Sequence, residues 1–210
     1  MGYVPSVRIF GVFANPQAAS YTKPMSDDTP IIDSAMSFEE AIAGITIPAE
    51  ILENLALVDV QYVSFDGLLH QGQLIIHKEL AEDVKERFAE LLALHFPIQK
   101  IIPIVQYGWD DIASMEDNNS SGFNYRVILG TDRLSNHSYG RAIDINTSTN
   151  PYNAIDGSIL PKGAVYDVTE PGTFVADSSA VGVFTSYGWT WGGSWTEPDW
   201  QHFEKGRPRQ

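Results

Sequence analysis

The sequence predicts an α+β fold in which helices flank an antiparallel sheet. Two alternating apolar stretches separated by a tight turn, within residues 58–77, predict a β-hairpin. An amphipathic stretch over residues 78–95 predicts one long helix. Further strand-like stretches follow without regular alternation with helices, and this order favours α+β over α/β.

The composition is that of an acidic globular protein. Its 210 residues suffice for one domain with a buried core, and 43% of them are hydrophobic. The formal net charge of −14 would repel a phosphate backbone, so we expect no nucleic-acid partner. The chain has no cysteine, which excludes disulfides, thiolate metal ligands and a cysteine nucleophile. Any metal must therefore be held by His, Asp and Glu.

The N-terminal residues 1–45 are expected to form an arm, partly irregular, outside a main domain of residues 46–210. The first part of this arm mixes Pro, Gly, Ser and Asp with short apolar stretches. Ser37 precedes Glu40 by three residues, the spacing of a capping box, which predicts a short helix that stops near Gly44.

The hairpin and the long helix follow. Alternation over residues 58–63 predicts a half-buried strand, Asp66-Gly67 predicts the turn, and residues 74–77 predict the returning strand. The helix, ended by Pro97, has an apolar stripe of residues three and four apart: Leu80, Val84, Phe88, Leu91, Leu92 and His95. Asp83 and Arg87, four apart, are expected on its solvated side.

The sequence of the second half of the chain predicts short strands and loops. Residues 100–107 predict a strand with an edge or bulge at Pro103, and the polar residues 109–123 predict a loop. Residues 147–182 are rich in Pro, Gly, Ser, Thr and Asn and are expected to be mostly loop. Further β regions are expected at residues 124–129, 141–146, 184–191 and 200–203.

The densest chemical signal is the stretch from Ser135 to Asp144. His137 offers an imidazole and Asp144 a carboxylate, and Gly140 between them lets the chain turn without a Cβ clash. Asp144 lies between Ile143 and Ile145, so in a strand it should face the side opposite to these apolar neighbours.

A catalytic zinc site needs three protein ligands and one open position for water. Of the other histidines, only His202 has several carboxylates within a few residues, which makes it the best third ligand. Asp199 precedes it by three residues, and a carboxylate there can take a proton from metal-bound water. We expect His70, His77 and His95 to be structural.

These residues resemble the M15 zinc peptidases: D,D-carboxypeptidases, D-Ala-D-Ala dipeptidases and L-alanyl-D-glutamate endopeptidases. The resemblance extends over about residues 58–204 and rests on three stretches, SxHxxGxAxD at 135–144, Trp191-Gly192-Gly193, and DWQHFE at 199–204. The late segment looks most like the D-alanyl-D-alanine carboxypeptidase-like members. The resemblance implies a Hedgehog/DD-peptidase-like fold, a Zn2+ cofactor and peptidoglycan stem peptides as substrate.

The resemblance also implies residue roles. Residues matching the zinc ligands are His137, Asp144 and His202. Asp199 matches the catalytic base, Ser135 begins the motif and supports its loop, and Arg126 resembles the arginine that polarises the scissile carbonyl. Many relatives have Glu in place of Asp199, and the Asp form looks like that of the endopeptidases. The implied reaction is direct attack by water without a covalent intermediate.

Other roles stay open for several residues. Arg126 can instead pair with Asp132, and Asp199 can be a turn residue after Pro198. Glu204 either orients a ligand imidazole or pairs with Lys205. Aromatic residues at strand spacing either line the cleft or pack in the core: Trp189, Trp191 and Trp200. A pair of Asp144 with Arg141 is disfavoured, since three-residue spacing puts them on opposite sides of a strand.

The leading hypothesis is therefore a zinc peptidase of the bacterial cell wall, D-alanyl-D-alanine carboxypeptidase-like. Alternatives are an L-alanyl-D-glutamate-type endopeptidase, a catalytically silent zinc-stabilised wall-binding module, and a zinc-free wall-binding domain. A lysostaphin-type enzyme would need a His-x-His pair, but the late segment reads Gln201-His202-Phe203.

The expected location is the cell envelope, periplasmic or secreted. No apolar stretch is long enough to span a membrane, so we expect no integral membrane segment. The first twenty residues do not form a convincing signal peptide, because they lack a basic start and Pro5 and Arg8 interrupt the apolar run. We expect the native signal peptide to be missing from this sequence. Nothing in the sequence indicates an oligomeric state.

Overall fold

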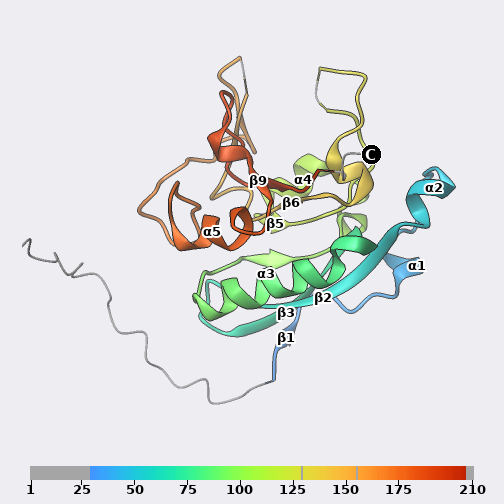
Figure 1. Ribbon diagram of the computed structural model, residues 1–210, viewed down its shortest axis with the longest axis horizontal. Helices are drawn as coiled ribbons and strands as arrows, with labels where there is room; N and C mark the ends of the chain where they lie inside the picture. The colour runs from blue at the N-terminus through green and yellow to red at the C-terminus, as the bar shows by residue number, and fades with distance from the viewer. Residues whose placement is uncertain (1–28, 129, 155, 207–210) are drawn as a thin grey trace, which may run out of the picture.

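The computed structural model describes residues 29–128, 130–154 and 156–206. It is a mixed α+β structure with small sheets and few helices. In Figure 1 the first sheet and α3 form the lower part of the molecule, and a second sheet with α4 and α5 forms the upper part. The predicted α+β class is confirmed at this level.

The first sheet is built on the expected hairpin. Strands β2 (Leu55–Val63) and β3 (Leu69–His77) pair antiparallel, and β1 (Ile31–Ile32) joins the outer edge of β3 in parallel. The Asp66-Gly67 turn closes the hairpin, with Gly67 at φ 79° and the Asp66 carboxylate accepting from the Leu68 N–H at 2.8 Å. Both strands are longer than predicted.

Helix α3 (Ala81–Ala93) follows a short 3-10 helix, η1 (Lys78–Leu80), and packs on β2. Its buried stripe includes Val84, Phe88 and Leu91, as predicted. The helix ends in a left-handed His95 at φ 53°, where the Phe96 N–H donates to the Leu91 carbonyl. His95 is exposed, so its prediction as part of the apolar stripe is wrong.

A second prediction about this helix, that Arg87 lies on its solvated side, is wrong. Arg87 pairs with Asp83 as expected at four-residue spacing, but it is only 1% exposed. Helix α5 (Ser179–Thr185) covers that side, so the guanidinium donates to the Val183 carbonyl and stacks on the Tyr187 ring at 3.3 Å. The side of α3 that the sequence marks as solvated is therefore an interface between helices.

The second sheet contains β6 (Ala142–Asp144), β10 (His202–Glu204) and β9 (Thr190–Trp191), all antiparallel. Phe203 at its centre stacks on Phe184 of α5 at a centroid distance of 4.3 Å. One apolar cluster joins this sheet to β2, β3 and α3. Because the core is continuous between the two sheets, the strands that carry the candidate ligands rest on the hairpin.

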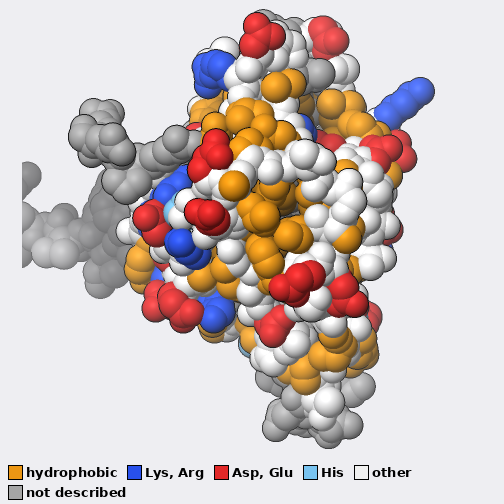
Figure 2. Space-filling model, turned by 90° about the vertical axis from the view of Figure 1, so that its right-hand side faces the viewer, with side chains coloured by type: hydrophobic (Ala, Val, Ile, Leu, Met, Phe, Trp, Pro, Cys, Tyr) orange, Lys and Arg blue, Asp and Glu red, His pale blue; other side chains and the backbone are white. Residues whose placement is uncertain are grey.

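The segment that precedes the hairpin packs on the domain. Helix α1 (Phe38–Ala41) begins with the predicted capping box, in which Ser37 and Glu40 bond reciprocally, and α2 (Ala49–Leu52) follows Pro48. Both contribute to a second apolar cluster around Phe123. Figure 2 shows the side of the molecule on which they lie, where apolar side chains gather between acidic ones. Residues 1–28 of the predicted arm lie outside the described residues.

Several short elements differ from the sequence prediction. The predicted strand 100–107 is only β4 (Lys100–Ile101), followed by a 3-10 helix, η2 (Ile104–Tyr107). The predicted loop 109–123 contains α4 (Asp111–Glu116), capped by Asp110, and β5 (Asn119–Ser120). Residues 124–128 form no strand and contribute one isolated bridge, Val127 to Leu134.

The predicted late β region differs as well. Residues 179–185 form α5, so the β region expected from residue 184 contains only β9, followed by a 3-10 helix, η4 (Gly192–Ser194). The long loop before it contains one short hairpin, β7 (Tyr152–Asn153) with β8 (Ile159–Leu160). Within the described residues, no helix is both long and apolar enough to cross a membrane.

Candidate metal centre and active site

Three predicted ligands converge in the second sheet. His137 comes from the 3-10 helix η3 (Asn136–Tyr139), Asp144 from β6 and His202 from β10, where it lies directly opposite Asp144. The Asp144 carboxylate oxygens lie 3.1 Å from His137 Nε2 and 2.9 Å from His202 Nδ1, and these two nitrogens are 3.1 Å apart. All three side chains are buried, and one ligand atom from each lies within 4.8 Å of the others.

The turn between His137 and Asp144 depends on two residues of the motif. Ser135 caps η3, with its hydroxyl oxygen accepting from the His137 N–H at 3.3 Å. Gly140 has φ 62° and its carbonyl accepts from the His77 N–H at 2.7 Å, so the turn lies directly on β3. A Cβ at Gly140 would come within 2.5 Å of the His77 nitrogen. A glycine is required there both for the left-handed backbone and for this contact.

Each imidazole is oriented by an acceptor outside the cluster. His137 Nδ1 lies 2.5 Å from the Gly122 carbonyl, and His202 Nε2 lies 3.1 Å from the Glu204 carboxylate. Asn136 in turn donates to Glu204 at 2.8 Å. If His137 Nδ1 and His202 Nε2 each donate a hydrogen bond to these acceptors, His137 Nε2 and His202 Nδ1 carry lone pairs. These lone pairs face each other and Asp144.

This donor set fits a zinc ion. Two imidazole nitrogens and a carboxylate oxygen face one another within 4.8 Å. Two neutral His and one carboxylate form a ligand set that zinc accepts in a tetrahedral site with one open position. Glu204 occupies the place expected of an orienting residue, while Lys205 pairs with Asp83 instead.

The electrostatic field of the cluster favours a positive charge. Burial alone would lower the pKa of His202, but hydrogen bonds with Asp144 and Glu204 raise it to about 10. Burial would raise the pKa of Asp144, but the charges and hydrogen bonds of His137 and His202 hold it well below its usual range. A cation at this point is therefore stabilised by the carboxylates around it.

Asp199 lies beside the cluster with one oxygen free. Its Oδ1 is buried and has no hydrogen-bond partner in the described structure. Burial and the nearby Asp144 charge raise the pKa of Asp199 to about 6, against the lowering effect of His202. The Asp199 N–H donates to the Gly192 carbonyl at 3.1 Å, and a Cβ at Gly192 would come within 2.6 Å of the Asp199 carbonyl oxygen. Gly192 therefore allows this close approach.

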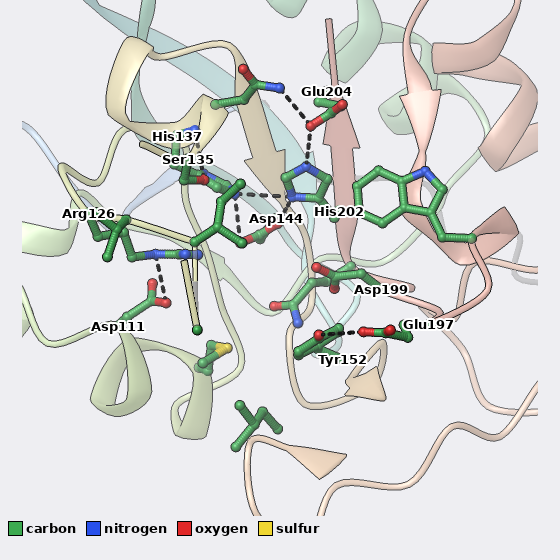
Figure 3. Close-up of a pocket in the computed structure, with 18 of the residues that line it drawn as sticks. Asp111, Arg126, Ser135, His137, Asp144, Tyr152, Glu197, Asp199, His202 and Glu204 are labelled. Carbon is green, nitrogen blue, oxygen red and sulfur yellow. Dashed lines mark hydrogen bonds and ion pairs between the residues drawn. The ribbon is translucent and has the colours of Figure 1, made fainter. Parts of the chain in front are cut away.

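Arg126 lies on the other side of the ligands, paired with Asp111 of α4 rather than with Asp132. Its Nε is 3.0 Å from an Asp111 oxygen but is not aligned for a hydrogen bond, so the contact is an ion pair. Figure 3 shows Arg126 and Asp111 on one side of the candidate ligands, and Tyr152 and Glu197 on the other.

These groups line one cavity of about 820 Å³. Its walls come from the segments 126–136 and 195–204 and from the short hairpin after residue 150. The cavity contains the three candidate ligands, Asp199, Arg126, Ser135 and Glu204. The predicted site residues are therefore brought together, with one exception.

That exception is Trp191, which is buried in the core and donates its indole N–H to the Trp200 carbonyl. Its neighbour Trp195 lines the cavity instead, with its ring 5.3 Å from that of His202. Sequence reasoning also missed Asp111, Asn136, Tyr152, Glu197 and Gln201. They lie on loops or short elements with no spacing pattern, so only the fold brings them to the cavity.

The remaining histidines lie outside the cluster. His70 is hydrogen-bonded between Asp33 and Asp66, His77 contacts Arg141, and His95 is exposed at the end of α3. Arg141 pairs with Glu79 and points away from Asp144, as strand geometry predicts.

Comparison with known protein families gives a match in the second half of the chain. Residues 129–205 match the family model described as D-alanyl-D-alanine carboxypeptidase, of the M15 peptidases. This segment is therefore similar to the M15 peptidases. It contains the three candidate ligands, Asp199 and Glu204, whereas Arg126 and Asp111 precede it. No curated protein and no solved structure matches the chain. The M15 match is shorter than the resemblance expected over residues 58–204.

Proposed function

We propose that the protein is a zinc-dependent peptidase that hydrolyses amide bonds next to D-amino acids in peptidoglycan stem peptides, in the manner of D-alanyl-D-alanine carboxypeptidases. One observation carries this proposal: a single cavity contains a buried His-Asp-His donor set and, beside it, a buried carboxylate with a free oxygen. The M15 match of residues 129–205 supports peptidase chemistry. The proposed location is the cell envelope, periplasmic or secreted.

Zinc held by His137, Asp144 and His202 would supply a Lewis acid that activates water and polarises the scissile carbonyl. The protein's own residues then move the proton and support the charge. Asp199 accepts a proton from the attacking water through its free oxygen and returns it to the leaving amine as the C–N bond breaks. Arg126, held by Asp111, stabilises the negative charge that develops on the carbonyl oxygen.

Endopeptidase action of the L-alanyl-D-glutamate type is the second candidate. It is favoured by the identity of residue 199, which is Asp as in the endopeptidases rather than the Glu of many relatives. The binding-module alternative predicts bound metal without turnover. It gives no reason for a buried free carboxylate oxygen at Asp199.

The test is to incubate the zinc-loaded protein with defined muropeptides and to read product masses, with Asp199→Asn as the matched control. Loss of a terminal D-alanine would establish carboxypeptidase action, and release of the stem after L-alanine would establish endopeptidase action. No product from any substrate, with zinc still bound, would overturn the peptidase proposal and favour the binding module.

A further inference from the structure

The cavity wall beyond Asp199 carries hydrogen-bond acceptors that the hydrolysis itself does not use. Glu197 and Tyr152 meet there, with the Tyr152 hydroxyl donating to a Glu197 carboxylate oxygen at 3.4 Å (Figure 3). Among the described residues, no Lys, Arg or His forms an ion pair with Glu197. This carboxylate therefore faces the cavity without a cation to balance it.

Backbone contacts fix both residues in place. Tyr152 forms an isolated antiparallel bridge with Asp199, and the Asn153 N–H donates to the Pro198 carbonyl at 2.9 Å. The segment that carries Glu197 is thus bonded to the short β7–β8 hairpin that carries Tyr152. These backbone contacts hold the pair in the wall of the cavity next to Asp199.

Gln201 provides a second sign of a ligand. Its side chain lines the same cavity and the residue is only 2% exposed, yet its Oε1 has no hydrogen-bond partner in the described part of the chain. A buried acceptor without a donor costs free energy, so this oxygen is suited to a donor that arrives with a ligand.

The charges around the cavity indicate what that donor is. Five acidic residues line it, against two arginines, Arg126 and Arg133, and the two histidines of the ligand cluster. Both arginines come from the segment before η3, whereas Glu197, Tyr152 and Gln201 lie on or beside the Asp199 segment. A carboxylate, a hydroxyl and an amide oxygen are all acceptors, and a primary ammonium group offers three N–H donors and one positive charge.

We propose that Glu197, Tyr152 and Gln201 form a subsite for a primary ammonium group on the substrate, close to the bond that is cleaved. This inference rests on the proposed peptidase function and adds a specificity to it. The ammonium group can come from the side chain of a diamino acid or from the free amino terminus of a short peptide.

The test compares matched peptides that differ in one charge. One pair carries a diamino acid with its side-chain amine free or acetylated, and a second pair has a free or acetylated amino terminus. We expect the zinc-loaded protein to prefer the free amine in one pair by about tenfold or more in kcat/KM, mainly through KM. The pair that shows the preference identifies the source of the ammonium group.

Glu197→Gln removes the negative charge and keeps the shape. We expect Glu197→Gln to reduce the kcat/KM preference for the free amine to less than about threefold, again through KM. Glu170→Gln, which removes the same charge at an exposed residue outside the cavity lining, should keep the full preference. Equal kcat/KM for free and acetylated peptides in the unaltered protein, or an unchanged preference in Glu197→Gln, would overturn the subsite.

Equilibrium binding separates this inference from the proposed function. The same peptides are titrated by calorimetry into zinc-loaded Asp199→Asn protein, so that the readout does not depend on turnover. A preference for the free amine that Glu197→Gln abolishes supports the subsite even if no peptide is hydrolysed. Equal binding of free and acetylated peptides overturns it even if hydrolysis is observed.

Discussion

The two imidazoles of the cluster are held by different kinds of acceptor. The backbone carbonyl of Gly122 fixes His137, whereas the Glu204 side chain, itself bonded to Asn136, fixes His202. A carbonyl in the main chain cannot be removed by substitution, but a carboxylate can. The contribution of imidazole orientation to zinc affinity can therefore be measured at His202.

Replacing Glu204 by Ala should weaken zinc affinity by about 10- to 100-fold, since His202 would lose the acceptor that fixes its ring and favours the inner lone pair. Competition with a chromophoric chelator measures the change. Glu170→Ala, at an exposed site away from the cavity, is the control. An unchanged affinity in Glu204→Ala would mean that His202 does not ligate through Nδ1.

Asp199→Asn should separate proton transfer from metal binding. Asn keeps the shape of the side chain but cannot take up a proton, so kcat should fall by about 10²- to 10⁴-fold. Zinc affinity should change little, because Asp199 is not one of the three ligands. A variant that retains full turnover would show that another group is the base.

The convergence of His137, Asp144 and His202 could be predicted from sequence, because they lie in one dense motif and at one late His with nearby carboxylates. The residues that surround them could not be predicted. Asp111 lies fifteen positions before Arg126 in an unremarkable polar stretch, and only the helix α4 turns it toward the guanidinium. Trp191 and Trp195 have equally ambiguous spacing. Trp191, for which both roles were open, packs in the core, and Trp195 lines the cavity.

Among the elements, those defined by local chemistry were predictable. The capping box, the Asp66-Gly67 turn and the α3 stripe each depend on residues a few positions apart. Short helices such as α4 and α5 were not, because a single cap such as Asp110 decides whether a polar stretch forms a helix. The segment 179–185 has apolar residues that suit either a strand or a helix, and the Ser178 cap makes it α5.

Gly140→Ala should destabilise the protein more than Gly44→Ala. Both glycines have positive φ, 62° and 76°, so both substitutions cost free energy through the backbone. Only at Gly140 would the new Cβ also meet β3, within 2.5 Å of the His77 nitrogen, whereas nothing lies within 4 Å at Gly44. We expect an additional loss of about 1–3 kcal/mol, measured by urea unfolding of both variants. Equal losses of stability in the two variants would mean that the turn at Gly140 can move away from β3.

At the scale of the whole molecule, one buried group links the outer strand to the hairpin. His70 on β3 lies 2.9 Å from Asp33, just after β1, and 3.1 Å from Asp66 in the turn. Tyr62 on β2 also donates to Asp33, and its hydroxyl accepts from the Ile101 N–H. This network joins segments far apart in the sequence, so its charge state affects overall stability.

The network predicts a pH dependence of unfolding. Burial alone would lower the pKa of His70, but the hydrogen bonds with Asp33 and Asp66 raise it. The stabilisation that His70 gives the folded state is thus fully present below its unfolded pKa of about 6.5. It is lost as the pH rises through the higher pKa of the folded state. His70→Gln should have a lower free energy of unfolding than the unaltered protein at pH 6, and this difference should narrow toward pH 9. The exposed His95→Asn is the control, and a gap independent of pH would contradict the prediction.

The positions of the ligands along the chain have one more consequence. His137 and His202 are 65 positions apart, so an ion that binds both closes a long loop in a chain that has no cysteine to form a disulfide. A covalent closure of that length would stabilise a fold by about 4 kcal/mol through the entropy of the unfolded chain. Lys162, exposed in this loop, is the only Lys or Arg between Arg141 and Lys205.

Trypsin should therefore cut after Lys162 much faster once a chelator has removed the metal, giving two fragments that mass spectrometry identifies. Equal cleavage rates with and without chelator would show that the loop is held by its own packing. If the rates differ, the supply of zinc would set the lifetime of the protein as well as any activity that depends on the metal, and metal-free protein would be degraded rather than stored.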